Sequence, residues 1–224
     1  MRPESPISNS TAGSHSSAIP SPKSNSTIDE GYIKFNCSWE KQKLNITIPD
    51  EIKVWRDRMY DLKLIGHYED LNVGYGNISM LMEENMLVSG TQTGEISPIQ
   101  DEHFTIVDDY DIDRNWVNCI GNLKASSESL THLAIYQCDE SIKAIIHIHN
   151  LSLWEQLIDR LPTTDKNVPY GTPEMAKEIK RLFQESDVSL GKIIVMAGHE
   201  EGIISFGKTI AEAGNNILEL INHP

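Results

Sequence analysis

The sequence has few of the features that mark secreted and membrane proteins. Its three cysteines, Cys37, Cys119 and Cys138, are odd in number and far apart along the chain. This spacing gives neither a disulfide framework nor a paired Cys-x-x-Cys metal site, so we expect reduced cysteines. No run of about 18 apolar residues could span a bilayer, and the first residues lack the apolar core of a secretory signal. We therefore expect a cytoplasmic protein without a membrane partner.

Positive charge is also scarce. The chain has 19 Lys and Arg against 33 Asp and Glu, a formal net charge of -14. Proteins that bind nucleic acids generally gain affinity by neutralising phosphates with a basic face, so this balance disfavours a nucleic-acid partner. A small anionic ligand remains compatible with it, because a few local donors can outweigh a diffuse negative field.

The length leaves no room for a second catalytic domain. The chain has 224 residues, of which 39% are hydrophobic, enough for one sizeable core. Residues 1–28 contain nine Ser and four Pro and very few apolar residues. Because such a segment has nothing to bury, we predict a disordered tail over 1–28 and a single domain over 29–224.

Helical and strand patterns alternate irregularly along this domain. Residues 49–66 have the spacing of an amphipathic helix, with apolar positions at Ile52, Trp55, Met59 and Leu62. A second helix has Thr172 as N-cap and Pro173 at its first position. The predicted helices are 49–66, 126–138, 151–161, 172–186 and 208–221. The predicted strands are 76–82, 86–90, 103–112, 116–121, 143–149, 192–198 and 202–207. Early hairpins followed by mixed elements predict an α/β fold, a three-layer α/β/α sandwich around a mostly antiparallel or mixed sheet.

The strongest chemical signal is the pair His147 and His149 on the predicted strand 143–149. Residues two apart on a strand point to the same face, so both imidazoles can bind one metal ion. Taken alone, such a pair is more often two partly buried structural histidines than a metal site.

Three further segments add polar groups that suit a phosphate and a metal. Ser126 and Ser127 precede a predicted helix, where free backbone N–H groups favour an anion, although they could also be a plain N-cap. The segments 74–79 and 89–94 combine glycine with small polar side chains, which suits close approach to a phosphate oxygen or an ordinary hairpin turn. The segment 198–202 supplies another imidazole and two carboxylates.

These motifs and their order resemble the class II aldolase/adducin superfamily. They are GNIS, SGTQTG, SSE before a helix with His132 and Tyr136, HIH, VPYGTPE and GHEEGIISFGKTIAEA, and the resemblance covers about residues 50 to 221. The superfamily includes divalent-metal enzymes that act on phosphorylated ketoses, and also adducin, whose head has lost the metal site and serves as an interaction module. The resemblance implies a class II aldolase-like domain and a homo-oligomer, in the first place a tetramer.

The resemblance also implies roles for individual residues. His147 and His149 match the ligands of one divalent metal ion, for which we expect zinc. Glu128 matches the general acid/base of the aldolases. In the second loop, Thr91 or Thr93 could take the phosphate-binding role instead of the matched pair. The matched phosphate-binding positions are Asn77, Ser89, Gly90, Ser126 and Ser127.

The segment of the third metal ligand departs from the family pattern. The enzymes usually have a histidine directly before a glycine, but here Glu201 precedes Gly202 and His199 lies two residues earlier. On an extended strand His199 and Glu201 would share a face, so either could complete the site, and we favour His199. The loop after the HIH motif and the carboxy terminus are short, so Tyr170 is the remaining candidate for a catalytic tyrosine.

The predicted function is that of a divalent-metal-dependent lyase of the aldolase type, in carbohydrate metabolism. Its substrate would be a small phosphorylated sugar and its intermediate a metal-stabilised enediolate. The motifs do not distinguish aldol cleavage from epimerisation, dehydration or decarboxylation. The alternative is an adducin-like interaction module without catalysis. A cupin-type barrel, which also uses an HxH motif, is disfavoured because helical patterns follow His149.

Overall fold

The computed structural model describes residues 31–223, so the predicted tail over 1–28 lies outside the described residues. Within them, a sheet of eight strands has the order β1-β7-β6-β5-β4-β8-β10-β9, and β2 and β3 form a separate hairpin. All neighbours in the large sheet are antiparallel except β1 and β7, which are parallel. The prediction of a mostly antiparallel or mixed sheet is therefore confirmed.

The elements have the following bounds. The strands are β1 (Asn36–Lys41), β2 (Gly66–Tyr68), β3 (Val73–Tyr75), β4 (Asn77–Met82), β5 (Asn85–Ser89), β6 (Phe104–Asp111), β7 (Trp116–Gly121), β8 (Ala144–His149), β9 (Ile193–Val195) and β10 (Gly202–Gly207). The helices are α1 (Asp50–Asp61), α2 (Ser129–Cys138), α3 (Leu151–Leu157), α4 (Pro173–Glu185), α5 (Val188–Gly191) and α6 (Ile210–Asn222), with a 3₁₀ turn η1 (Asp101–His103).

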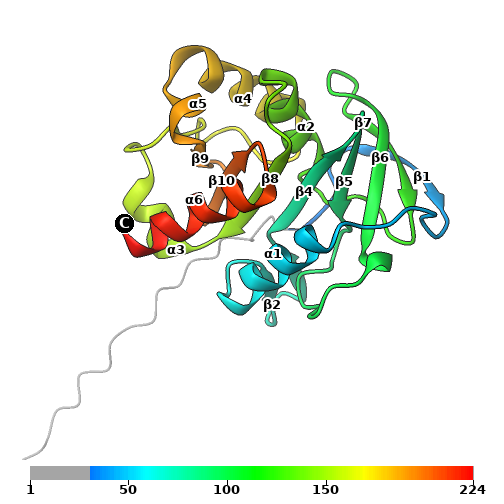
Figure 1. Cartoon of the computed structure of the whole chain (residues 1–224). Helices are drawn as coiled ribbons and strands as arrows, with labels where there is room; N and C mark the ends of the chain where they lie inside the picture. The colour runs from blue at the N-terminus through cyan, green and yellow to red at the C-terminus, as the bar shows by residue number, and fades with distance from the viewer. Residues whose placement is uncertain (1–30, 224) are drawn as a thin grey trace, which may run out of the picture.

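Helices cover both faces of the sheet, which gives the predicted three layers (Figure 1). Side chains of α2, α4 and α5 pack with one face of the sheet into a first hydrophobic core. Side chains of α1, α3 and α6 pack with the other face into a second core. The sheet therefore lies between two apolar layers, and its strands β8 and β10 are buried along their whole length.

The predicted helices form, with differences at their ends. Thr172 caps α4 as expected, because its hydroxyl accepts a hydrogen bond from the backbone N–H of Met175 at 3.3 Å. The placement of Leu62 on the apolar face of the first helix is wrong. That helix ends at Asp61, and Leu62 is 43% exposed before Lys63 turns the chain with a φ of 59°. The third helix also ends early, at Leu157, shortly before Asp159 adopts a φ of 60°.

Strand β1 was not predicted from the sequence. Strand β1 pairs in parallel with β7, and the indole N–H of Trp39 donates to the carbonyl of Gly121 at 3.0 Å. This pairing brings two cysteines together that are distant in the sequence. The Sγ atoms of Cys37 and Cys119 lie 3.1 Å apart, and the structure has all three cysteines as free thiols.

The register of the sheet places the predicted site at one end of β8. His147 pairs with Asn77 of β4 on one side and with Ile204 of β10 on the other. His149 pairs with Gly202, the first residue of β10. The GNIS motif, the HIH motif and the turn before β10 therefore meet because β8 lies between β4 and β10.

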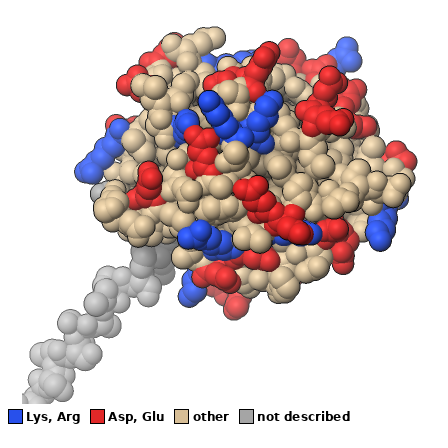
Figure 2. Space-filling view, in the orientation of Figure 1, with Lys and Arg blue, Asp and Glu red and all other residues tan. Residues whose placement is uncertain are grey.

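The surface agrees with the scarcity of positive charge. Figure 2 shows acidic side chains over the face drawn, interspersed with Lys and Arg and without a continuous basic patch. Within the described residues, none of the helices has both the length and the apolar character needed to cross a membrane.

Candidate active site

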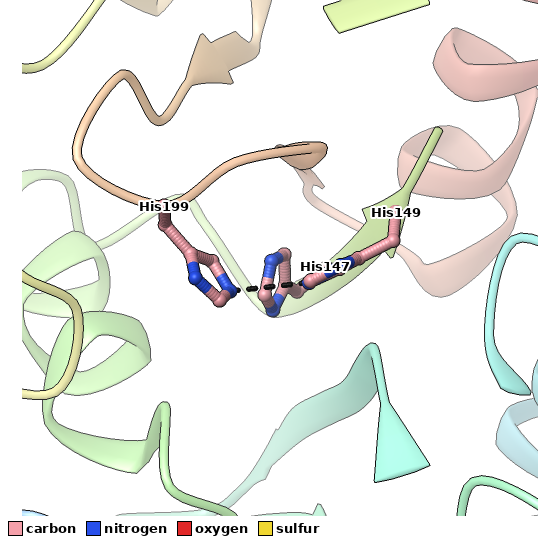
Figure 3. A group of neighbouring side chains, drawn as sticks. All are labelled: His147, His149 and His199. Carbon is pink, nitrogen blue, oxygen red and sulfur yellow. Dashed lines mark hydrogen bonds between the residues drawn. The ribbon is translucent and has the colours of Figure 1, made fainter. Parts of the chain in front are cut away.

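Three histidines form a buried cluster at the end of β8. His147 and His149 extend from that strand, and His199 reaches them from the turn between β9 and β10 (Figure 3). One ring nitrogen of each lies within 4.8 Å of the others, and Nε2 of His149 is 3.1 Å from Nε2 of His199. The structure thus brings the strand pair and His199 to one point.

A tight turn, and not an extended strand, places His199 in the cluster. The backbone N–H of His199 donates to the carbonyl of Met196, and the N–H of Gly202 donates to the carbonyl of His199 at 2.9 Å. Gly202 is needed for space, because a Cβ there would lie 2.7 Å from Cδ2 of His199 and 3.2 Å from Nε2 of His147. The expectation of an extended segment in which His199 and Glu201 share a face is therefore wrong, and the preceding strand ends at Val195.

The cluster has the electrostatics of a metal site. Burial lowers the pKa of His147 to about 3. Burial and the neighbouring imidazoles hold the pKa values of His149 and His199 well below the ordinary range of histidine. All three rings are therefore neutral near pH 7, with lone pairs available, and Nε2 of His147 has no hydrogen-bond partner among the described residues. Three converging neutral imidazoles fit a divalent ion such as zinc.

Glu201, the other candidate for the third ligand, lies outside the cluster. Its Oε2 accepts a hydrogen bond from the hydroxyl of Tyr68 at 2.6 Å and lies 4.0 Å from Nδ1 of His149. That nitrogen is on the opposite side of the ring from the Nε2 that meets His199. The structure therefore brings His199, and not Glu201, to the predicted metal pair.

Glu128 lies directly beside the histidines, at the N-cap of α2. Its Oε1 is 3.9 Å from Nε2 of His199, and the side chain is 2% exposed. Burial raises the pKa of Glu128 to about 7, against the opposing charge of Lys34. A buried carboxyl that titrates near neutral pH suits a group that carries a proton in catalysis.

A small polar hollow adjoins Glu128 where the glycine-rich loops meet the start of α2. Its lining includes every predicted phosphate-binding position except Ser89. It also includes Thr91 and Thr93, the two alternatives in the second loop. Ser89 is absent from its lining, because its hydroxyl is turned to β4 and accepts a hydrogen bond from the backbone N–H of Ile78 at 3.2 Å. The lining residues are Gly31, Gly74, Gly76, Asn77, Gly90, Thr91, Gln92, Thr93, Gly94, Ser126, Ser127 and Glu128.

Arg56, which sequence reasoning missed, holds one wall of this hollow. It extends from α1, is 1% exposed, and donates to the carbonyls of Thr93 at 2.5 Å and Gly94 at 3.0 Å, and also to that of Ile96. Gly94 fits only without a side chain, since a Cβ would lie 1.9 Å from the carbonyl oxygen of Gly66. In the sequence, the one indication of Arg56 was that it directly follows Trp55, an apolar position of the first predicted helix.

Tyr170 contacts the site through its ring. The ring centroid lies 4.5 Å from that of His199, whereas the hydroxyl accepts a hydrogen bond from the backbone N–H of Tyr32 at 3.1 Å. Lys34 lies over this ring, with Nζ 3.7 Å from the centroid, and its charge also lowers the pKa of His199. Nothing in the sequence indicated Lys34, because it lies far from the recognisable motifs.

Comparisons with known proteins agree with this architecture. The family described as "Class II Aldolase and Adducin N-terminal domain" matches residues 62–222. The 3-oxo-tetronate 4-phosphate decarboxylase of Haemophilus influenzae is 24% identical over 169 residues, which cover 66% of this chain and 73% of that protein. The L-fuculose phosphate aldolase of Methanococcus maripaludis is 28% identical over 171 residues, covering 69% and 81%. A sugar-phosphate aldolase from Thermotoga maritima has the same fold, with a TM-score of 0.60 at 18% identity over 77% of this chain and 89% of that chain.

Proposed function

This chain belongs to the class II aldolase and adducin family, and we propose that it is a divalent-metal-dependent lyase that breaks a carbon–carbon bond of a small phosphorylated sugar. The observation that carries the proposal is the meeting of three neutral imidazoles with a buried, titratable carboxyl. His147, His149 and His199 supply nitrogen donors, and Glu128 lies 3.9 Å from one of them. An interaction module has no need of such a cluster, so this geometry favours an enzyme over the adducin-like alternative.

The donor set supports zinc as the ion. Neutral imidazoles are common zinc ligands, and three of them leave a coordination position for substrate. When bound, the ion would supply a Lewis acid that polarises the substrate carbonyl and stabilises the negative charge that develops there. His147, His149 and His199 would hold it.

The polar hollow is the proposed phosphate site. Asn77, Ser126 and Ser127 supply side-chain donors, and the beginning of α2 adds backbone N–H groups and the positive end of the helix dipole. Glu128 lines the same hollow and also lies beside His199. A phosphate held there would place the neighbouring carbon atoms between Glu128 and the histidines, where the carboxyl can move a proton.

The names of the relatives suggest two reactions with a shared intermediate. Decarboxylation of a 3-oxo acid breaks the bond to the carboxylate carbon and releases carbon dioxide. Aldol cleavage breaks the bond between the carbon next to a carbonyl and a carbon that bears a hydroxyl group. That hydroxyl gives up its proton to a base, and its carbon leaves as an aldehyde. In both cases the electron pair of the broken bond moves into the carbonyl group and leaves an enediolate, which must then be protonated. Glu128 can serve both reactions as that proton carrier.

A substrate comparison tests the proposal. The full chain with added zinc is incubated separately with 3-oxo-tetronate 4-phosphate and with L-fuculose phosphate, and products are followed by NMR. We expect cleavage of at least one, with carbon dioxide marking decarboxylation and an aldehyde marking aldol cleavage. Unphosphorylated L-fuculose is the control and should remain intact. Absence of cleavage of both phosphates with zinc, manganese and magnesium would contradict the proposal.

Lys34 provides a test of the preference for an anion. Its ammonium group stands over the ring that contacts His199, so it adds positive charge beside the site. Loss of a favourable interaction with a charged group typically costs about 1.5–3 kcal/mol, and 1.4 kcal/mol is a factor of about ten. Lys34→Met should therefore raise the KM of a phosphorylated substrate about tenfold or more in steady-state kinetics. Lys43→Met, at an exposed lysine outside the site, is the matched control, and equal KM values in the two variants would refute a role for Lys34.

We also propose that the protein forms a homo-oligomer, and the form we expect is a tetramer. The support is the family resemblance alone. Light scattering should give a mass of about four times 25.2 kDa, the mass of one chain. A mass of one chain at the concentration used for the activity measurements would contradict it.

A further inference from the structure

A hydrogen-bonded pair lies behind one of the three histidines. Tyr68, on β2, donates its hydroxyl proton to Oε2 of Glu201 at 2.6 Å. The same hydroxyl oxygen lies 3.1 Å from Nδ1 of His149. Nε2 of this ring faces His199 inside the cluster, at 3.1 Å. His149 therefore contacts Tyr68 through one nitrogen and the cluster through the other.

The direction of these hydrogen bonds fixes the proton on His149. A phenol has a single proton, and here the carboxylate of Glu201 receives it. The phenol oxygen can then only accept from His149, so the imidazole proton must be on Nδ1. A metal ion binds only an imidazole nitrogen that carries no proton, and an imidazole with its one proton on Nδ1 presents the lone pair of Nε2 to the cluster. This is the tautomer that a metal ion bound at Nε2 requires.

The surroundings hold this pair in place. The ring of Tyr75, on β3, packs against both Tyr68 and His149. Its centroid lies 4.4 Å from the ring centroid of Tyr68 and 5.3 Å from that of His149. Glu201 adopts a φ of 69°, which residues with a side chain rarely do, and its carbonyl accepts from the backbone N–H of Asn150 at 3.0 Å. The turn thus directs the carboxylate of Glu201 to Tyr68, although the positive φ of Glu201 is an unfavourable backbone conformation.

We propose that Tyr68 and Glu201 are positioning residues that select the metal-binding tautomer of His149. The inference rests on the proposed metal site, and it gives a role to the carboxylate that stands where the family usually has its third histidine. Hydrogen-bonding partners behind a ligating histidine typically change metal affinity about 10- to 100-fold. Tyr68 and Glu201 act through His149 and need not touch the substrate.

The tautomer is measurable in the metal-free chain, independently of catalysis. Histidine labelled with ¹⁵N should show His149 with its proton on Nδ1 in the wild type. In Tyr68→Phe that proton loses its acceptor, whereas a proton on Nε2 could still be donated to His199, so the signal should shift toward the Nε2–H form. A wild-type spectrum with the proton on Nε2, or the same tautomer in Tyr68→Phe, would overturn the proposal.

Zinc affinity, measured by competition with a chelator, provides the second readout. Tyr68→Phe and Glu201→Ala should each weaken zinc binding about 10- to 100-fold with an unchanged melting temperature. Glu200→Ala is the matched control, because Glu200 is the adjacent, exposed glutamate of the same turn. If His147→Ala abolishes zinc binding but Tyr68→Phe binds as tightly as wild type, the positioning role is wrong and the metal site stands. If the wild type binds no zinc, both are wrong.

Discussion

His147→Ala is expected to abolish metal binding and turnover together. The substitution removes one of three converging nitrogen donors, and the two that remain cannot hold a divalent ion in a closed geometry. A bound ion supplies several kcal/mol of stabilisation to a developing negative charge, and each 1.36 kcal/mol is tenfold in rate. Turnover should therefore fall by at least about 10³-fold, and metal analysis of the purified variant should find none.

The control for this variant is a histidine far from the site. His223 follows α6 and is exposed, so His223→Ala should retain both metal and turnover. Circular dichroism of His147→Ala should show the wild-type fold, because the buried apolar layers on both faces of the sheet are unchanged. A folded His147→Ala protein that still bound one ion per chain would show that the metal lies elsewhere.

Glu128→Gln is expected to reduce turnover while the metal remains bound. Glutamine keeps the size and hydrogen-bonding capacity of the side chain but cannot transfer a proton. General acid/base catalysis typically contributes about 10²- to 10⁴-fold, so turnover should fall by a factor in that range. Because Glu128 is buried and its pKa is raised to about 7, the neutral amide should be tolerated by the fold.

Steady-state kinetics and metal analysis of the same preparation separate these two effects. Glu140→Gln, at an exposed glutamate beyond the end of α2, should behave as wild type in both measurements. Full turnover in Glu128→Gln would mean that another group carries the proton. Tyr170, whose ring lies against His199, would then be the next residue to substitute.

The order of motifs and simple periodicity were enough to predict much of this molecule. Two-residue spacing on a strand placed His147 and His149 on one face. The pairing of β8 with β4 and β10 then brings the GNIS motif and the turn before β10 next to these two histidines. The capped helix at Thr172 and the layered α/β/α fold followed from local signals in the same way.

The residues that were missed or misplaced depend on contacts between distant segments. Tyr68 contacts His149 from a hairpin, and Lys34 lies over the ring of Tyr170 from the segment before β1. The sequence showed no recognisable pattern in either segment. The position of His199 required a tight turn that ends at Gly202, where a side chain would crowd His199 and His147. The assumption of an extended strand wrongly placed Glu201 on the same face as His199. Ser89 lay in the right motif, but its hydroxyl bonds to the neighbouring strand.

Turnover titrated with zinc tests the central claim most directly. The full chain is depleted of metal with a chelator, zinc is returned in steps, and carbon–carbon cleavage of the better of the two phosphorylated substrates is measured at each step. We predict almost no cleavage in the depleted protein and a linear rise that breaks at one ion per chain, the capacity of a single three-histidine cluster. Cleavage that survives depletion unchanged, or that never appears with any added divalent ion, would contradict the account.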